Sequence, residues 1–249
     1  LLGSATPSIE SYHNADTGKY VLVELKKRFG GILLPEIQCV DIKQAHKRKE
    51  MHSSFSHDLL EHIKVALGNK EQIILFQNRR GYTPQWNCET CSWVPRCKNC
   101  DVSLTYHKST HQLICHYCAT AYPPPKTCSA CGSHKLKMVG FGTEKIEEDL
   151  ELLIPGIRIQ RLDLDSTRTK NAYVQILTDF EERNIDVLVG TQMVTKGLDF
   201  DNVALVGILN ADTMLNFPDF RAFERSYQLL SQVAGRAGRK GKRIGRAHV

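Results

Sequence analysis

Eight of the nine cysteines fall in four Cys-x-x-Cys pairs between positions 88 and 131. A two-residue spacer lets both thiolates of a pair reach one tetrahedral ion at about 2.3 Å, and two pairs complete a closed structural zinc site. Disulfides are the alternative, but repeated Cys-x-x-Cys pairs in a chain that shows no secretory leader more often bind metal. The spacing therefore predicts two structural Zn²⁺ ions, with iron–sulfur ligation as the lesser alternative.

The four pairs can be joined around two ions in three ways. Residues 103–107 and 113–116 predict two short strands around a turn, which would bring the second pair beside the third. The first pair would then share its ion with the fourth, although an arrangement in which consecutive pairs share an ion stays open. In the nested arrangement, one ion is bound by Cys88, Cys91, Cys128 and Cys131, and the other by Cys97, Cys100, Cys115 and Cys118.

A glutamine and two arginines lie at the end of the last long helix that the sequence predicts. Arg236 and Arg239 are three positions apart among small residues, and we expect them to share a helical face with Gln232 nearby. Guanidinium groups match phosphate oxygens and can stabilise charge on a transferring γ-phosphoryl group. A solvated basic helix end is the alternative, and spacing alone favours neither.

Polar residues also follow an expected strand over residues 186–190. The carboxyl ends of parallel strands are where α/β sheets bind ligands. Thr191 and Lys196 are therefore candidates to contact a DNA phosphate, and Asp199 is a candidate to hold a nearby arginine. An ordinary helix start and turn is the alternative.

Two further segments give weaker signals. Gly3, Ser4, Ala5 and Thr6 are small or hydroxylated residues that also suit a generic helix cap. Directly after another expected strand, a second group suits contact with a nucleotide or a nucleic-acid backbone, or an ordinary charged turn. This second group consists of Arg79, Arg80 and Tyr82.

Apolar strands alternate with amphipathic helices on both sides of the cysteine-rich segment, which predicts a parallel sheet covered on both faces. Cys39 stands alone in an apolar segment and is expected to be a buried small hydrophobe. Expected strands span residues 20–25, 36–41, 72–77, 157–162, 186–190 and 203–209. Expected helices span residues 58–67, 144–153, 171–182 and 220–234.

Composition sets wide limits on the class of protein. The 249 residues, 41% hydrophobic and 24% charged, suit one ordinary domain with a small inserted module, and no apolar run is long enough to cross a bilayer. A net charge of +6 favours a polyanionic partner but decides little alone. The absence of a leader leads us to interpret the sequence as part of a longer cytoplasmic, nucleoid-associated protein.

Taken in order, these segments resemble motifs of superfamily 2 DNA helicases. Residues 3–8 resemble motif III, 74–82 motif IV, 186–200 motif V and 228–239 motif VI. The cysteine-rich insertion after Tyr82 narrows the resemblance to the replication-restart helicases. The resemblance implies a RecA-like second helicase lobe over residues 19–87 and 132–249. It also implies a zinc-binding insertion over residues 88–131 and the end of a first lobe over residues 1–18.

The resemblance also implies an activity and roles for single residues. It implies an ATP-dependent 3′–5′ DNA helicase that uses ATP and Mg²⁺ in the full-length enzyme. Its partners would be single-stranded and forked DNA, primosome proteins and single-strand-binding protein, and the enzyme would be a monomer. Gln232, Arg236 and Arg239 would serve ATP hydrolysis, and Gly197 and Asp199 would couple nucleotide to DNA. The residues that would face the DNA strand are Thr191, Lys196, Arg79, Arg80 and Tyr82. Gly3, Ser4, Ala5 and Thr6 would transmit closure between lobes.

One departure from the helicase pattern limits what this chain can do. The sequence contains no glycine-rich phosphate loop ending in Gly-Lys-Ser or Gly-Lys-Thr, and no acidic Mg²⁺-binding motif. We therefore predict that the chain alone neither hydrolyses ATP nor unwinds DNA. The rival hypothesis is a non-catalytic zinc-ribbon module that binds nucleic acid or protein. That hypothesis explains the cysteines but not the glutamine and arginines near the C-terminus.

Overall fold

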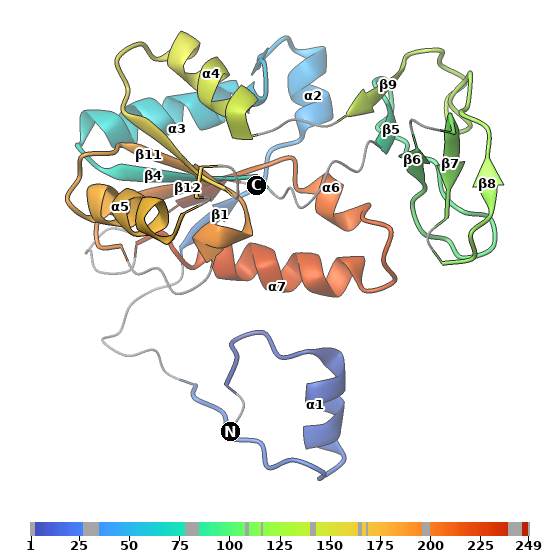
Figure 1. Cartoon of the computed structure of the whole chain (residues 1–249), viewed down its shortest axis with the longest axis horizontal. Coiled ribbons are helices and arrows are strands. Elements are labelled where there is room, and N and C mark those ends of the chain that lie inside the picture. The colour runs from blue at the N-terminus through green and yellow to red at the C-terminus, as the bar shows by residue number, and fades with distance from the viewer. Residues whose placement is uncertain are drawn as a thin grey trace.

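A six-stranded parallel sheet forms the centre of the computed structural model (Figure 1). The structure describes residues 3–26, 35–77, 85–107, 110–115, 117–139, 143–163, 166–167, 169–195, 200–238 and 246–248. The strand order is β1-β13-β12-β4-β11-β10, and every neighbouring pair is parallel. The strands are β1 (Glu36–Gln38), β4 (Gln72–Gln77), β10 (Ile159–Leu162), β11 (Val187–Gly190), β12 (Val203–Leu209) and β13 (Arg246–His248).

Helices cover both faces of this sheet (Figure 1). On one face, α3 (His57–Gly68) and α4 (Thr143–Leu153) share a core with Ile73 and Leu75 of β4. On the other face, α5 (Lys170–Glu181) and α7 (Ala222–Ala234) pack on Ile74 and Phe76. Because successive side chains of a strand point to opposite faces, the unbroken apolar run of β4 supplies both cores. The predicted parallel sheet covered on both faces is confirmed.

Hydroxyl and carboxylate side chains fix where several helices begin. The Ser56 hydroxyl accepts a hydrogen bond from the Leu59 N–H at 3.2 Å and so caps α3. Asp41 caps α2 (Ile42–Lys47) by accepting from the backbone N–H groups of Lys43 and Gln44. These caps satisfy N–H groups that have no partner inside the helix and so define where both helices begin.

The cysteine-rich segment forms a separate module of short antiparallel strands. Its first and last strands, β5 (Gln85–Cys88) and β9 (Leu136–Val139), pair with each other, so the chain leaves and re-enters the sheet domain side by side. Between them, β6 (Thr105–His107), β7 (Gln112–Ile114) and β8 (Ala121–Tyr122) form a three-stranded sheet. The remaining elements are α1 (Ile9–Asp16), β2 (Met51–His52), β3 (Phe55–Ser56), the 3-10 helix η2 (Gln192–Thr195) and α6 (Asp212–Leu215).

Two predictions near the N-terminus were wrong. Residues 20–25 form no strand, and Val21 and Leu25 are 91% and 92% exposed. The strand expected over residues 36–41 ends at Gln38, and Cys39 beyond it is exposed rather than buried. A short apolar run becomes a buried strand only where a sheet edge and a covering helix are available to it. None of the helices in the described part of the chain is long and apolar enough to span a bilayer.

Candidate functional site

The structure gathers the eight paired cysteines into two groups of four. One group holds Cys88, Cys91, Cys128 and Cys131, and the other holds Cys97, Cys100, Cys115 and Cys118, with the sulfurs of each group within 4.8 Å of one another. These are the two groups of the nested arrangement. The β5–β9 pairing closes the first group, and the β6–β7 hairpin, in which Thr105 faces Ile114, closes the second.

The same type of backbone turn occurs at each of the four Cys-x-x-Cys pairs. In each turn the residue directly after the second cysteine donates its N–H to the carbonyl of the first cysteine and has a positive φ of 50–73°. This left-handed conformation folds the chain back so that both sulfurs of a pair face the same side. The four bonds run from Ser92 to Cys88 (2.8 Å), Asp101 to Cys97 (3.0 Å), Ala119 to Cys115 (2.9 Å) and Gly132 to Cys128 (2.9 Å).

The sulfur distances fit a tetrahedral metal site. The Sγ atoms of Cys88 and Cys131 lie 3.6 Å apart, and those of Cys97 and Cys118 also lie 3.6 Å apart. Zinc–sulfur bonds of about 2.3 Å in a tetrahedron place sulfurs about 3.8 Å apart, whereas a disulfide requires about 2.05 Å. All nine cysteines are free thiols in the structure. The two clusters therefore fit two structural zinc ions.

Hydrogen bonds favour the thiolate form of selected cysteines. The Thr120 hydroxyl donates to the Cys118 Sγ at 3.1 Å and, as the main cause, lowers the Cys118 pKa to about 6. The Tyr122 hydroxyl, 3.4 Å from the Cys97 Sγ, lowers the pKa of Cys97. A hydrogen bond with Cys118 helps to raise the Cys100 pKa to about 12. A metal ion requires all four sulfurs as thiolates, so ion binding must release the protons that remain.

The segments that resemble motifs V and VI pack against each other. Val194 of η2 is fully buried in the same core cluster as Val233 of α7 and Ala237. Gly190 at the end of β11 permits this contact, because a Cβ atom there would lie 2.3 Å from the Val194 Cγ1. Half-buried Thr191 follows Gly190 at the carboxyl edge of the sheet. A movement of η2 therefore reaches α7 through direct packing.

Gln232 and Arg236 lie at the C-terminal end of α7. Gln232 is exposed on the last helical turn, and the helix ends at Ala234. Arg236 is half-buried in the turn that follows, where its N–H donates to the Val233 carbonyl at 3.0 Å. The helical face that we expected for the two arginines therefore does not extend to Arg236. Gly238, the last described residue of this turn, has a positive φ of 70°, which suits glycine.

The N-terminal segment lies against the opposite half of α7. Gly3, Ser4, Ala5 and Thr6 precede α1, and the Thr6 N–H donates to the Ser4 hydroxyl at 3.1 Å. From α1, the Ile9 N–H donates to the Glu224 Oε1 at 2.9 Å, and the Glu10 carboxylate pairs with the Arg221 guanidinium. The helix α1, which directly follows the segment that resembles motif III, thus contacts the start of the same helix that carries Gln232.

Several predicted site residues lie outside the described residues. They are Arg79, Arg80, Tyr82, Lys196, Gly197, Asp199 and Arg239.

The sequence reasoning overlooked two residues at the carboxyl edge of the sheet. The Thr143 hydroxyl at the start of α4 donates to the Asp163 Oδ2 at 2.5 Å. Burial opposes ionisation of Asp163, but hydrogen bonds from Thr143 and Ser166 outweigh it and lower the Asp163 pKa. Asp163 directly follows β10, just as Thr191 directly follows β11, so the strand-end pattern that singled out Thr191 could also have identified Asp163.

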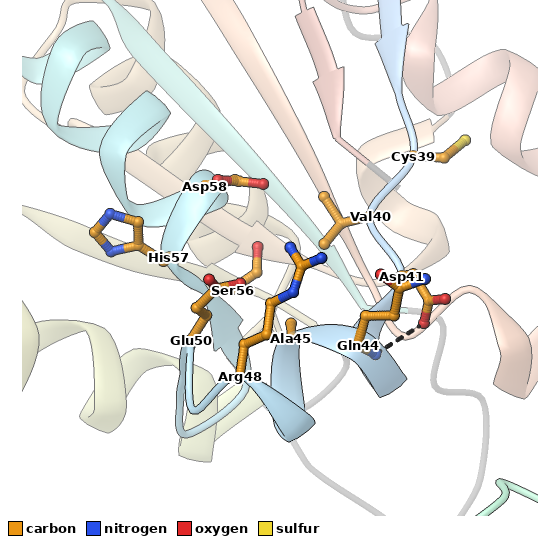
Figure 2. Close-up of a pocket in the computed structure, with 10 residues that line it drawn as sticks. All are labelled: Cys39, Val40, Asp41, Gln44, Ala45, Arg48, Glu50, Ser56, His57 and Asp58. Carbon is orange, nitrogen blue, oxygen red and sulfur yellow. Dashed lines mark hydrogen bonds between the residues drawn. The ribbon is translucent and has the colours of Figure 1, made fainter.

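A hollow elsewhere on the sheet domain contains none of the predicted site residues. It lies between α2 and the start of α3, and Cys39, Arg48 and Asp58 are among the residues that line it (Figure 2). Asp41 at its rim is engaged in capping α2, with the Gln44 N–H 3.1 Å from its carboxylate. The hollow is therefore separate from the cysteine clusters and from the α7 end.

Comparisons with known proteins give two matches to families. Residues 97–123 match the PriA DNA helicase Cys-rich region (CRR) domain, and residues 132–241 match the Helicase conserved C-terminal domain. These two matches cover the second cysteine cluster and most of the sheet domain that follows the module.

Individual relatives are similar over nearly the whole chain. It is 46% identical over 242 residues to the Replication restart protein PriA of Bacillus subtilis (strain 168), covering 97% of this chain and 30% of that protein. The corresponding protein of Chlamydia pneumoniae is 42% identical over 96% of this chain and 32% of its own length. The corresponding protein of Haemophilus influenzae is 41% identical over 97% of this chain and 33% of its own length. The chain thus spans about a third of the length of the relatives that it matches.

Proposed function

We propose that this chain, a homologue of the PriA replication restart proteins, is the second helicase lobe of an ATP-dependent 3′–5′ DNA helicase that restarts stalled replication forks. The observation that carries the proposal is the packing of η2 against α7 in a chain that also has the two cysteine clusters. A zinc ribbon alone needs no such contact. A helicase lobe needs this contact, because ATP hydrolysis must be coupled to movement on DNA through the lobe.

In the proposed enzyme, the end of α7 acts on ATP. Gln232, Arg236 and Arg239 would approach the γ-phosphate and stabilise the charge that develops as it leaves. This chain's sequence has no phosphate loop of its own. ATP and Mg²⁺ would therefore be held mainly by another part of the longer protein, most simply a first lobe. Residues 1–18 would be the end of that lobe, and Gly3, Ser4, Ala5 and Thr6 would transmit its closure to α7.

The carboxyl edge of the sheet acts on DNA in this proposal. Thr191 and Lys196 would contact the phosphates of a single strand, as would Arg79, Arg80 and Tyr82. Gly197 and Asp199 would couple the bound strand to the nucleotide. Support comes from the shared core of Val194 and Val233, since any shift of the strand-binding edge must repack α7.

The two clusters would each hold one Zn²⁺, and bound zinc would supply the cross-links that keep the module folded. Cys88, Cys91, Cys128 and Cys131 would bind the first ion, and Cys97, Cys100, Cys115 and Cys118 the second. The module divides the lobe into residues 19–87 and 132–249. Proposed partners are single-stranded and forked DNA, primosome proteins and single-strand-binding protein, acting with a monomeric, nucleoid-associated enzyme.

Substitution of Arg236 in the full-length protein tests this function. Arg236→Ala should lower DNA-stimulated ATPase by about 10³-fold or more, while zinc content and unfolding stay as in the wild type. Arg183→Ala removes an exposed arginine beyond the end of α5 and serves as the matched control.

Retained ATPase in Arg236→Ala would contradict the proposal and favour a non-catalytic zinc-ribbon module. The isolated chain gives a second test, since it should show no DNA-stimulated ATPase. Measurable hydrolysis by the purified chain would contradict the assignment of the phosphate loop to another part of the protein.

A further inference from the structure

The cysteine-rich module contacts the sheet domain at a place away from the chain connections at β5 and β9. The spacer of the Cys115/Cys118 pair meets the segment between α6 and α7, which lies between the sheet and the module (Figure 1). Tyr117 comes from the spacer, and Asp219 and Phe220 come from the segment, more than 100 positions away along the chain. The contact therefore depends on tertiary structure alone.

The Tyr117 side chain makes three kinds of contact at once. Its hydroxyl accepts a hydrogen bond from the Phe220 N–H at 3.2 Å and donates one to the Asp219 Oδ1 at 3.4 Å. Its ring meets the Phe220 ring edge-on, with centroids 6.3 Å apart and an interplanar angle of 78°. Edge-to-face packing is a favoured arrangement of aromatic rings. The ring and the hydroxyl can thus be tested separately.

Asp219 connects this contact to the start of α7. Its Oδ1 also accepts from the Arg221 N–H at 2.8 Å, and its Oδ2 pairs with the Arg225 guanidinium in the first turn of the helix. The N-cap residue of α7, Arg221, makes no side-chain capping hydrogen bond. Asp219, which also bonds Tyr117, therefore satisfies the backbone N–H of the N-cap residue and ties the first turn of α7 to this segment.

Both cysteine turns of the second cluster touch this segment. Tyr117 belongs to the turn in which the Ala119 N–H donates to the Cys115 carbonyl at 2.9 Å. From the other turn, Arg96 next to Cys97 reaches the Asn216 Oδ1 with its Nη2 at 3.5 Å. The geometry of both turns depends on how the four sulfurs are joined, so the cluster sets where Tyr117 and Arg96 lie.

We propose that Tyr117 is a positioning residue through which the second cysteine cluster holds the start of α7 and thereby the Gln232 and Arg236 end. α7 is one unbroken helix of 13 residues, about 20 Å long at 1.5 Å per residue. A displacement at its start therefore moves its far end. This inference rests on the proposed function, because that function assigns the far end of α7 to ATP hydrolysis.

The experiment compares Tyr117→Ala and Tyr117→Phe in the full-length protein with Tyr20→Ala. Tyr20 is 44% exposed, against 49% for Tyr117, and lies outside the module, so it is a matched control. The readouts are zinc content, amide hydrogen exchange over residues 219–226, and kcat and KM for ATP in DNA-stimulated hydrolysis.

Tyr117→Ala should keep both zinc ions and speed exchange over residues 219–226 by about tenfold, because two hydrogen bonds and the ring contact are lost. Its kcat should fall roughly three- to tenfold while KM for ATP changes by less than about twofold, the pattern of a misplaced catalytic group. Tyr117→Phe keeps the ring and should give smaller changes in the same direction.

Three results would overturn the inference. The first is that amide hydrogen exchange and kcat are the same in Tyr117→Ala as in Tyr20→Ala. Another is faster exchange with unchanged kcat, which would make the contact structural only. The third result concerns the case in which Tyr117→Ala loses zinc. Phe220→Ala then tests the contact from the side of the sheet domain, and an unchanged kcat in that variant would overturn the inference. Retained ATPase in Arg236→Ala would instead contradict the proposed function. The hydrogen exchange measured in Tyr117→Ala would still show whether Tyr117 holds the start of α7.

Discussion

The sheet domain and the cysteine-rich module reach a folded state by different means. The sheet domain buries large side chains such as Phe55 and Phe180 completely, in two cores on opposite faces. The module has one small core around Leu104 and Leu113, and cysteines form part of it. Apolar burial can support the sheet domain, whereas so small and loop-rich a unit needs cross-links. The comparison teaches that the two regions should respond to different perturbations.

The strand pair β5–β9 explains why such a module can be inserted without disrupting the sheet. Because Cys88 and Leu136 are paired neighbours, the chain that leaves the sheet domain returns beside itself. The β4 strand precedes the module and α4 follows it, and both pack in the sheet-domain cores. Loss of the module should therefore leave these cores closed.

The largest expected effect comes from removing two thiolates of the first cluster. Cys128→Ser combined with Cys131→Ser should lower the zinc content by one ion per chain, since binding worth about 10 kcal/mol or more depends on four ligands. Metal analysis and exchange over residues 85–88 measure this. Cys39→Ser, which changes the exposed ninth cysteine, should keep both ions. Unchanged zinc content in the double variant would break the comparison.

A core substitution in the sheet domain should destabilise the sheet domain and leave zinc binding by the module unchanged. Phe180→Ala empties a fully buried site and should lower the free energy of unfolding of the sheet domain by about 3–5 kcal/mol while both zinc ions stay bound. Urea unfolding with metal analysis measures both. Val174→Ala on the same helix, at a site 52% exposed, should change stability by less than about 0.5 kcal/mol. Zinc loss that shifts to lower urea together with sheet unfolding in Phe180→Ala would contradict the separation.

A smaller effect is expected from a single hydroxyl beside the second cluster. Tyr122→Phe removes the hydrogen bond to the Cys97 Sγ, which favours the thiolate, and should weaken zinc binding there by about tenfold. Competition with a chelator measures the affinity of each cluster, and the first cluster is the internal control. Equal weakening of both clusters would show that the hydroxyl acts on the whole module.

The smallest effect should come from an ion pair at the surface of the sheet domain. Hydrogen bonds from Arg158, the main cause, lower the pKa of Asp186, so the pair stabilises the fold above the ordinary carboxyl pKa. That contribution is lost as pH falls through the lowered pKa. Asp186→Asn should therefore cost about 1 kcal/mol at pH 7, and the difference from wild type should shrink below about pH 4. A difference that grows in acid would reverse the assigned sign.

Contiguous apolar runs made part of the fold predictable. The strands expected over residues 72–77 and 203–209 match β4 and β12 end to end, because both runs are buried on two faces. Helical periodicity likewise located α3, α4, α5 and α7 to within two residues at each end. The strands expected over residues 103–107 and 113–116 contain most of β6 and β7, and the pairing of these strands underlies the nested cysteine grouping.

The failures came where local sequence carries no information about partners. Residues 20–25 are as apolar as a true strand but have no sheet edge beside them in the described structure. Cys39 lies past the end of β1 and is exposed. The contact between Tyr117 and Phe220 joins distant segments, so no spacing could have indicated it. The helix expected over residues 220–234 ends with α7 at Ala234, so Arg236 lies beyond the helix and not on the helical face that we expected for it.

Removal of zinc from the reduced chain tests the central claim most directly. A chelator would be added and amide exchange followed across the whole chain by mass spectrometry. We predict that residues 88–131 lose protection as two zinc ions are released, while β4 and β12 stay protected by the two apolar cores. Loss of protection in the module and the sheet together, or no change because the cysteines are joined as disulfides, would contradict the account.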